Sequence, residues 1–244
     1  MTTLRIVTGA AGLIGRAVCQ HLRNTDGVLL ALDTHPGPDD STVLRLDSTS
    51  EAFATLLSEH LAGAERAELI HTAGTHPPLT TITDTPPEEF ARHTADLTHT
   101  YATARTFALA TRAAGIPASA VLLSTVGAHR YLAGYDAARA GIESLARSFT
   151  LEFARHLSVR AAAVGPIAQS ASTQADGPLA PALLALVPRG TYADLQDIAT
   201  ALATYATAPF DTTAGHTLTL DGGLTIQLRP ADVERRPGTA KPIS

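Results

Sequence analysis

A glycine-rich turn between an apolar run and an amphipathic stretch constrains the fold of this chain more than any other feature. Residues 4–7 (Leu-Arg-Ile-Val) are typical of a buried parallel strand. The turn at 8–15 reads TGAAGLIG, and apolar residues then recur at helical spacing to Leu22. Glycines let the backbone approach a pyrophosphate closely, and a helix N-terminus offers free N–H groups and a positive dipole end. The sequence thus predicts a phosphate-binding turn with the candidate contacts Gly9, Gly12, Leu13, Ile14 and Gly15.

An acidic residue ends the second predicted strand. The run 28–32 is apolar and is followed by Asp33, eighteen residues after Gly15. A carboxylate at this place can accept hydrogen bonds from the hydroxyls of an adenosine ribose, and it repels a 2′-phosphate. No Arg or Lys is adjacent to Asp33 or inside the turn 8–15. The pattern favours NAD(H) over NADP(H), and the alternative interpretation is an ordinary turn aspartate.

The rest of the chain alternates between predicted strands and helices. Apolar runs at 43–46, 68–70, 119–123, 159–164 and 216–220 predict strands. Amphipathic stretches at 51–61, 88–114, 135–156 and 194–207 predict helices. This alternation predicts one α/β domain over residues 1–228, a single-domain Rossmann fold. Its doubly wound parallel sheet has about seven strands and helices on both faces. Residues 229–244 are a polar tail.

The remaining candidate ligand contacts follow the predicted strands. Ligands of doubly wound sheets bind outside the carboxyl ends of the strands. Asp47 is placed to meet an adenine, and a capping role is its alternative. The small pair Ala73 and Gly74 suits a backbone lying against a cofactor, and Pro166 and Ile167 are candidate contacts because they follow the sixth predicted strand.

One stretch combines three groups that can do chemistry. Ser124 ends an apolar run, Tyr135 follows eleven residues later, and Arg139 comes four residues after that. Tyr135 and Arg139 share a helix face at this spacing. A serine, a tyrosine and a cation held together can polarise a carbonyl or take a proton from an alcohol. The alternative is a strand, a loop and a helix with ordinary surface polar groups.

With these residues in view, the chain resembles the short-chain dehydrogenase/reductases over about residues 4–224. The resemblance rests on TGAAGLIG at 8–15, Asp33, Asp47, HTAG at 71–74, DLTHTY at 96–101, Ser124, Tyr135, Gly165-Pro166 and DGG at 221–223. It implies hydride transfer between a nicotinamide and a hydroxyl or carbonyl carbon. It further implies that Ser124 holds the substrate oxygen and that Tyr135 is the general acid/base.

The chain departs from the family pattern at two catalytic positions. The lysine of the family's Y-x-x-x-K is Arg139, and the helix asparagine is Asp96. A guanidinium keeps the charge and can bind a ribose, but it is never deprotonated in practice and cannot relay a proton. Asp96 either receives the proton or pairs with Arg139. Asp96 and Arg139 are therefore included among the candidate catalytic residues. Tyr135 and Arg139 are also predicted cofactor contacts.

Three classes of function remain open. The first is an NAD(H)-dependent oxidoreductase with a modified Ser-Tyr-Arg triad. The second is a non-redox enzyme, a dehydratase, isomerase or cyclase, that uses Ser124 and Tyr135 as acid/base groups. The third is an inactive nucleotide-binding protein. Four histidines, His71, His76, His93 and His129, are candidates for proton transfer, although a surface or loop role is favoured for each.

Composition and charge narrow the partners. The formal net charge is −5 and the arginines are scattered, so neither nucleic acid nor an anionic membrane is an expected partner. The single cysteine, Cys19, and the absence of a signal-peptide pattern predict a cytoplasmic protein, and no metal site is expected. Apolar residues in the loop 167–193 suggest a small, fairly apolar substrate or a subunit contact. The family resemblance implies a homodimer or homotetramer through helices 88–114 and 135–156.

Overall fold

The computed structural model describes residues 2–37, 41–76, 78–127, 129–170 and 183–227. Its centre is a seven-stranded parallel sheet with the order β3-β2-β1-β4-β5-β6-β7. The strands are β1 (Thr3–Thr8), β2 (Val28–Asp33), β3 (Leu44–Arg45), β4 (Arg66–His71), β5 (Ala118–Thr125), β6 (Leu157–Val164) and β7 (Thr217–Leu220). The predicted doubly wound sheet is confirmed. The predicted tail 229–244 lies outside the described residues.

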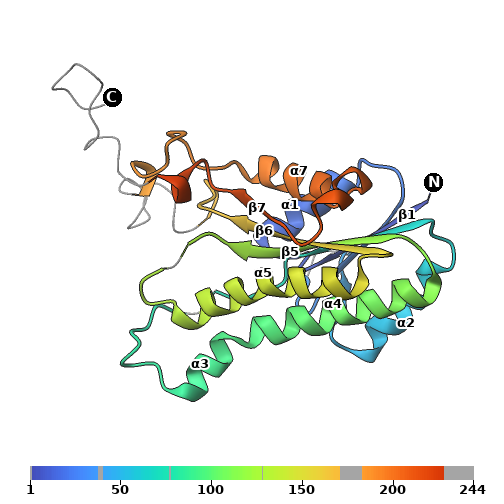
Figure 1. Ribbon diagram of the computed structural model, residues 1–244, viewed down its shortest axis with the longest axis horizontal. Coiled ribbons are helices and arrows are strands. Elements are labelled where there is room, and N and C mark those ends of the chain that lie inside the picture. The colour runs from blue at the N-terminus through green and yellow to red at the C-terminus, as the bar shows by residue number, and fades with distance from the viewer. Residues whose placement is uncertain (1, 38–40, 77, 128, 171–182, 228–244) are drawn as a thin grey trace.

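Helices cover both faces of this sheet. Figure 1 shows α1 and α7 on one side and α2, α4 and α5 on the other. The helices are α1 (Leu13–Leu22), α2 (Glu51–Leu61), α3 (Pro87–His93), α4 (Ala95–Ala114), α5 (Ala133–Phe153) and α7 (Leu195–Tyr205), with 3₁₀ turns η1 (Ala208–Thr213) and η2 (Leu224–Ile226). Asp194 begins α7 as predicted, because its side chain accepts the N–H of Gln196. No helix in the described ranges is both long and apolar enough to cross a membrane.

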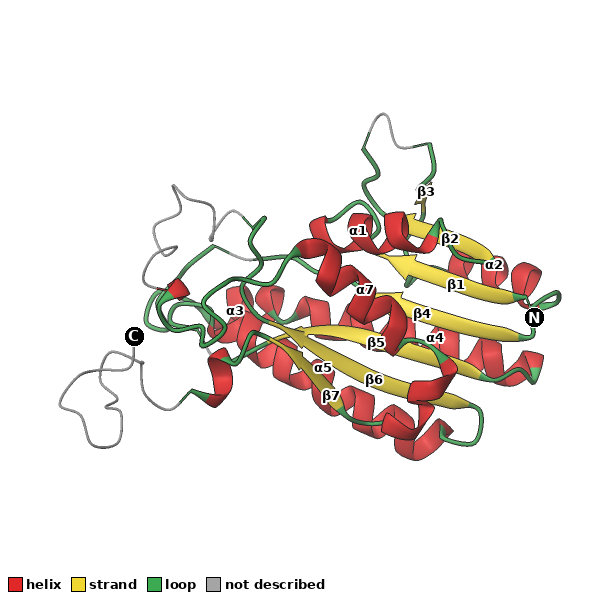
Figure 2. Ribbon diagram, turned by 90° about the horizontal axis from the view of Figure 1, so that it is seen from above, coloured by secondary structure: helices red, strands yellow, loops and turns green. Residues whose placement is uncertain are grey.

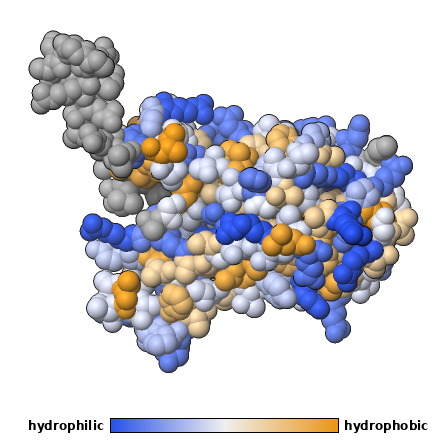
Figure 3. All heavy atoms as spheres, viewed as in Figure 1, coloured by the Kyte–Doolittle hydropathy of each residue, from blue (hydrophilic) through white to orange (hydrophobic). Residues whose placement is uncertain are grey.

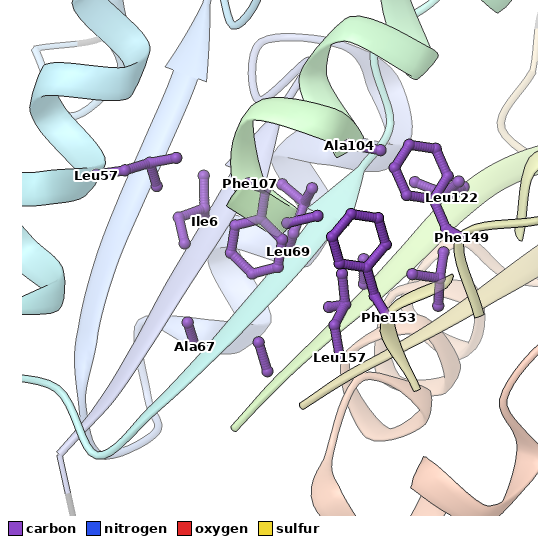
Figure 4. Close-up of a cluster of buried hydrophobic side chains, with 14 of the residues drawn as sticks. Ile6, Leu57, Ala67, Leu69, Ala104, Phe107, Leu122, Phe149, Phe153 and Leu157 are labelled. Carbon is purple, nitrogen blue, oxygen red and sulfur yellow. The ribbon is translucent and has the colours of Figure 1, made fainter. Parts of the chain in front are cut away.

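The larger core lies between the sheet and the layer of α2, α4 and α5. Figure 4 shows Phe107 of α4 and the α5 pair Phe149 and Phe153 beside Leu122 and Leu157 of the strands. The inward faces of α4 and α5 carry apolar side chains at i, i+3 and i+4 positions. Removing this apolar surface from water stabilises the folded state. A second apolar cluster joins α1 and α7 to the opposite face. These two layers hold the strand ends in fixed positions.

The prediction of one continuous helix over 88–114 is wrong, because the structure has the two helices α3 and α4 there. The break lies at Thr94, which has φ −92° and ψ 0° and caps both α3 and α4. The Thr94 hydroxyl donates to the carbonyl of Ala91, and such local bonds compete with a regular helix. The break makes Asp96 a residue of the first turn of α4. The helix predicted over 135–156 runs instead from Ala133 to Phe153, and the strand predicted at 43–46 shortens to two residues.

Small residues on α5 serve the fold of this chain itself. A Cβ on Gly141 would lie 2.7 Å from Leu97 of α4, so this glycine lets the two helices approach. Ala137 and Ala140, two further small residues of α5, are exposed. On the face shown in Figure 3, apolar side chains are dispersed among hydrophilic ones. The predicted oligomer contact through these helices stays a prediction.

Candidate active site

A cavity of about 300 Å³ opens at the carboxyl ends of β1, β2 and β4. Figure 2 shows the arrowheads of β1, β4, β5, β6 and β7 on the side of the molecule where α3 lies. The residues that form the cavity wall include six predicted cofactor contacts: Gly9, Gly12, Asp33, Asp47, Ala73 and Gly74. Asp96 and His99 line it as well. Segments far apart in sequence therefore meet at one sheet edge, as expected for a nucleotide site.

The glycine turn is packed for close approach. A Cβ on Gly15 would lie 2.1 Å from the carbonyl oxygen of Gly9, so only glycine lets α1 begin this close to the turn. Gly15 therefore shapes the cavity without lining it. Leu13 is exposed and lines a neighbouring groove between α1 and α7, while Ile14 packs against the second apolar cluster. Of the five predicted turn contacts, Gly9 and Gly12 line the cavity.

Asp33 is tied to the glycine turn. One of its carboxylate oxygens accepts the N–H of Ala11 at 3.0 Å, and the other accepts the N–H of His35 at 2.9 Å. Two arginines that the sequence does not place near this carboxylate approach it in the fold. Arg45 pairs with Asp33 in the sheet register, and Arg16 donates to the carbonyl of Ala11 at 3.2 Å. The Arg45 guanidinium donates to the carbonyl of Thr34 at 3.4 Å, so these two positive charges lie near the carboxylate.

Asp47 and His99 line the cavity, and His71 is buried behind His99. The N–H and the hydroxyl of Thr49 donate to Asp47, and these bonds, with His99 nearby, hold its pKa below the usual value. His99 lies 3.6 Å from Asp47 and stacks on His71 at 5.5 Å between ring centroids. His71 is 1% exposed and bridges Thr8 at 2.7 Å and Thr100 at 3.0 Å. The surface or loop role favoured for His71 is wrong, because it is the last residue of the buried strand β4.

Burial of His71 should make the fold sensitive to acid. Burial, with repulsion from His99 and Arg139, lowers the pKa of His71 to about 3. The unfolded chain therefore binds one more proton than the folded chain between about pH 6.5 and that value. Stability is fully present above this window, and it falls by about 1.4 kcal/mol per pH unit as the pH decreases through it.

The variant His71→Asn keeps a hydrogen-bonding side chain but cannot titrate. We expect its free energy of unfolding, measured in urea at pH 7 and pH 5, to fall less on acidification than that of the wild type. His60→Gln is the matched control, because His60 lies on α2 and its ring nitrogen bonds the Leu56 carbonyl of the same helix. Equal pH dependence in His71→Asn and the wild type would show that His71 does not limit acid stability.

Tyr135, Arg139 and Asp96 meet next to the cavity. The Arg139 guanidinium lies over the Tyr135 ring at 4.8 Å. It donates to the carbonyl of Leu123 at 3.2 Å and to a carboxylate oxygen of Asp96 at 3.2 Å. The predicted pairing of Asp96 with Arg139 is confirmed. The same Asp96 oxygen accepts the N–H of Thr75 at 2.8 Å.

The guanidinium is almost completely enclosed. The side chain of Arg139 is 7% exposed, and its Nε has no hydrogen-bond partner among the described residues. Gly74 is needed beneath it, since a Cβ there would lie 2.3 Å from an Arg139 nitrogen. Arg139 is thus fixed by Asp96, Leu123 and Gly74, and it presents a constant positive charge to the Tyr135 ring.

Ser124 does not offer its hydroxyl to a substrate in this geometry. It is 3% exposed, and its Oγ lies 3.0 Å from the Arg139 carbonyl and 2.9 Å from a Glu143 carboxylate oxygen. Side chains alternate along a strand, so the next residue, Thr125, faces the other way. Thr125 is partly exposed at the last position of β5, with its Oγ1 3.2 Å from the carbonyl of Val164. The Ser124 hydroxyl therefore faces α5, and the Thr125 hydroxyl faces the opposite side of the sheet.

The last predicted contacts follow β6. Pro166 is partly exposed, whereas Ile167 is buried at 6% and bridges to Ala193. Neither lines the cavity in the described chain. The residues 171–182 of the predicted apolar loop lie outside the described residues. No cluster of three or more His, Cys, Asp or Glu that could hold a metal occurs in the described ranges.

Comparison with known proteins identifies the family. A family model described as enoyl-(acyl carrier protein) reductase matches residues 9–225. An uncharacterized short-chain type dehydrogenase/reductase of Sinorhizobium fredii is 31% identical over 240 residues. The chain belongs to the short-chain dehydrogenase/reductase family. The alignment covers 89% of this chain and 43% of that relative, so the chain spans about half the length of the relative.

Solved structures confirm the fold of this short-chain dehydrogenase/reductase. Carveol dehydrogenase from Mycobacterium avium in complex with NAD superposes with a TM-score of 0.81 at 18% identity, covering 92% of this chain and 98% of that one. A 4-hydroxyisoleucine dehydrogenase complexed with NADH gives the same TM-score and identity, covering 93% and 100%. The likeness extends over nearly the whole of each chain, so the architecture here is that of the family.

Proposed function

We propose that this protein is an NAD(H)-dependent oxidoreductase acting on a hydroxyl or carbonyl group of a small, fairly apolar molecule. The observation that carries the proposal is the position of Tyr135. Its ring lies against a buried, fixed cation at the strand-end edge that also holds the nucleotide-sized cavity. Family membership and the cofactors named for the two structural neighbours support it. We include in the proposal a cytoplasmic homodimer or homotetramer.

The cavity residues fit the parts of a dinucleotide. Gly9 and Gly12 would lie against the pyrophosphate, Asp33 would accept from the adenosine ribose, and Asp47 with His99 would meet the adenine. Ala73 and Gly74 offer a flat wall toward Arg139, whose enclosed Nε lacks a described partner. When bound, the nicotinamide group supplies or accepts the hydride.

The protein's own part is proton transfer and orientation. Tyr135 would take the hydroxyl proton of an alcohol, or donate a proton to a carbonyl oxygen in the reverse direction. The Arg139 charge beside the ring would face the negative charge that develops on the Tyr135 oxygen during proton transfer. Ser124, after a side-chain rotation, would supply the second hydroxyl that orients the substrate oxygen. The triad of this proposal is therefore a hydroxyl, Tyr135 and Arg139, with Asp96 positioning the arginine.

A non-redox reaction on the same fold is the second candidate. One observation favours it: the backbone N–H and the ring of His129 both contact Asp136, with 2.8 Å between Nδ1 and a carboxylate oxygen. Asp136 is the neighbour of Tyr135 in sequence. A histidine oriented by a carboxylate is an acid/base arrangement suited to a dehydratase or isomerase.

Titration with NADH tests the first proposal. We expect NADH fluorescence to change on binding, and Asp33→Asn to weaken the affinity about tenfold, because a hydrogen bond to a charged group is lost. The exposed residue Asp26 gives a matched control, Asp26→Asn, which should bind like the wild type. NADPH is titrated in parallel, since Arg16 and Arg45 lie near Asp33.

A panel of secondary alcohols and ketones then separates the two candidates. Turnover that is lost in Tyr135→Phe supports the oxidoreductase. Binding of NADH without turnover of any member of the panel would favour the non-redox reaction, and absence of binding would refute the dinucleotide site.

A further inference from the structure

The loop between β4 and α3 brings a titratable ring to Tyr135. His76 lies with its ring centroid 5.1 Å from that of Tyr135, tilted by 41°. It is exposed, so a proton on it can exchange with water. Tyr135 thus lies between a fixed cation and the imidazole ring of His76.

Arg139 and Asp96 are both held by hydrogen bonds and are poorly placed to carry the Tyr135 proton. Arg139 stays protonated, and two of its nitrogens are held by Leu123 and Asp96. One Asp96 oxygen accepts from both Arg139 and the Thr75 N–H, and the other lies 3.4 Å from the Thr75 hydroxyl. This carboxylate is occupied as an acceptor, which argues against the expectation that it receives the proton.

Asp96 also fixes the position of the histidine. It binds Thr75, the residue directly before His76. Further along the loop, the N–H of Thr80 donates to the carbonyl of Tyr131 at 2.9 Å and so joins it to the segment before α5. At the left of Figure 1, the β4–α3 loop runs beside the start of α5. His76 is therefore held against Tyr135 by bonds on each side.

We infer that His76 exchanges the Tyr135 proton with solvent, a step that rests on the proposed oxidoreductase function. During alcohol oxidation the substrate O–H bond breaks and its proton joins the Tyr135 phenolate. The phenol O–H bond then breaks and the proton joins the neutral His76 imidazole. The imidazolium releases this proton to water, and carbonyl reduction runs the same steps in reverse. Among the described residues, Arg139 of α5 contacts the Tyr135 ring, and Asp96 of α4 bonds Thr75 beside His76.

Coupled titration tests the contact without any cofactor or substrate. The midpoint of His76 is followed by proton NMR and assigned with His76→Gln. The midpoint of Tyr135 is followed by tyrosinate absorbance and assigned with Tyr135→Phe. Coupling between two sites is reciprocal. We expect the His76 midpoint to move in Tyr135→Phe and the Tyr135 midpoint to move by about one pH unit in His76→Gln. His60→Gln should leave both midpoints unchanged. Unchanged midpoints in both site variants would overturn the inference.

Chemical rescue tests the proton transfer itself. With an alcohol that the wild type oxidises, His76→Ala should lower kcat about tenfold or more and leave KM nearly constant. Added imidazole should restore kcat in His76→Ala and have no effect on Tyr135→Phe. Normal kcat, or lowered kcat without rescue, would refute the role of His76. Failure of the wild type to oxidise any alcohol would instead refute the proposed function, so the two failures are distinguishable.

Discussion

Replacing Arg139 by lysine is expected to lower activity about ten- to a hundredfold, although lysine is the residue that the family pattern carries there. The guanidinium reaches Asp96 and the Leu123 carbonyl at once and lies over the Tyr135 ring. An ammonium group is a point charge that cannot reproduce this planar arrangement. Loss of one hydrogen bond involving a charged group corresponds to about 1.5–3 kcal/mol, which is about one to two powers of ten in rate. The measurement is kcat/KM with the alcohol that the panel identifies.

The double variant Arg139→Lys/Asp96→Asn makes this test specific. It restores both residues of the family pattern together, so we expect it to recover activity relative to either single variant. A positive interaction energy in this cycle would show that the two positions act as one unit. Arg147→Lys, at an exposed position of the same helix, is the control for a general effect of the exchange. An Arg139→Lys variant as active as the wild type would show that Arg139 merely replaces lysine.

The fold was predictable because its signals are local and repeated. The run 4–7, the turn 8–15 and the following helical spacing each specify one element, and their order specifies a parallel sheet. Six of the predicted cofactor contacts line one cavity because strand ends meet at one edge. The prediction of one helix over 88–114 failed at Thr94. There the side-chain hydroxyl bonds to the backbone and the helix is interrupted, although the helical sequence pattern continues.

The site was harder to predict because it depends on side-chain direction and on contacts distant in sequence. Ser124 and Thr125 differ by one position, and strand alternation turns their hydroxyls to opposite faces. Nothing in the local sequence says that Glu143 takes the Ser124 hydroxyl. The His71 bridge between Thr8 and Thr100 joins residues 63 and 29 positions apart. Such contacts follow from the assembled sheet and are invisible to periodicity.

A buried charge cluster lies far from this site, near the amino end of β4. Asp211 of η1 accepts two bonds from Arg66, the first residue of β4, at 3.0 and 3.1 Å. It also accepts one from Arg160 of β6 at 3.3 Å. Arg160 is completely buried and lies over the Tyr205 ring at 5.1 Å. Its Nε and Nη1 have no hydrogen-bond partner among the described residues. Burial lowers the pKa of Arg160, and Asp211 is the main group that opposes this effect.

Asp211→Ala is expected to be the most destabilising of these variants, because it leaves the buried Arg160 charge without its carboxylate. Breaking a buried pair from one side costs about 3–5 kcal/mol. Because Asp211 is itself 38% exposed, we expect about 3 kcal/mol, or a melting temperature lower by about 6–12 °C in a chain of this size.

Removing the charge instead of its partner should have the opposite result. Arg160→Met deletes the unpaired nitrogens and keeps an apolar stem, so its stability should equal or exceed that of the wild type.

Asp211→Ala combined with Arg160→Met should then be more stable than Asp211→Ala alone. The control Glu152→Ala, at an exposed site of α5, should change stability by less than about 0.5 kcal/mol. Additive losses in the double variant would mean that Asp211 stabilises η1 through Arg66 and not by neutralising Arg160. NADH binding should stay normal in all these variants because none of the changed residues lines the cavity, which separates a loss of stability from damage to the site.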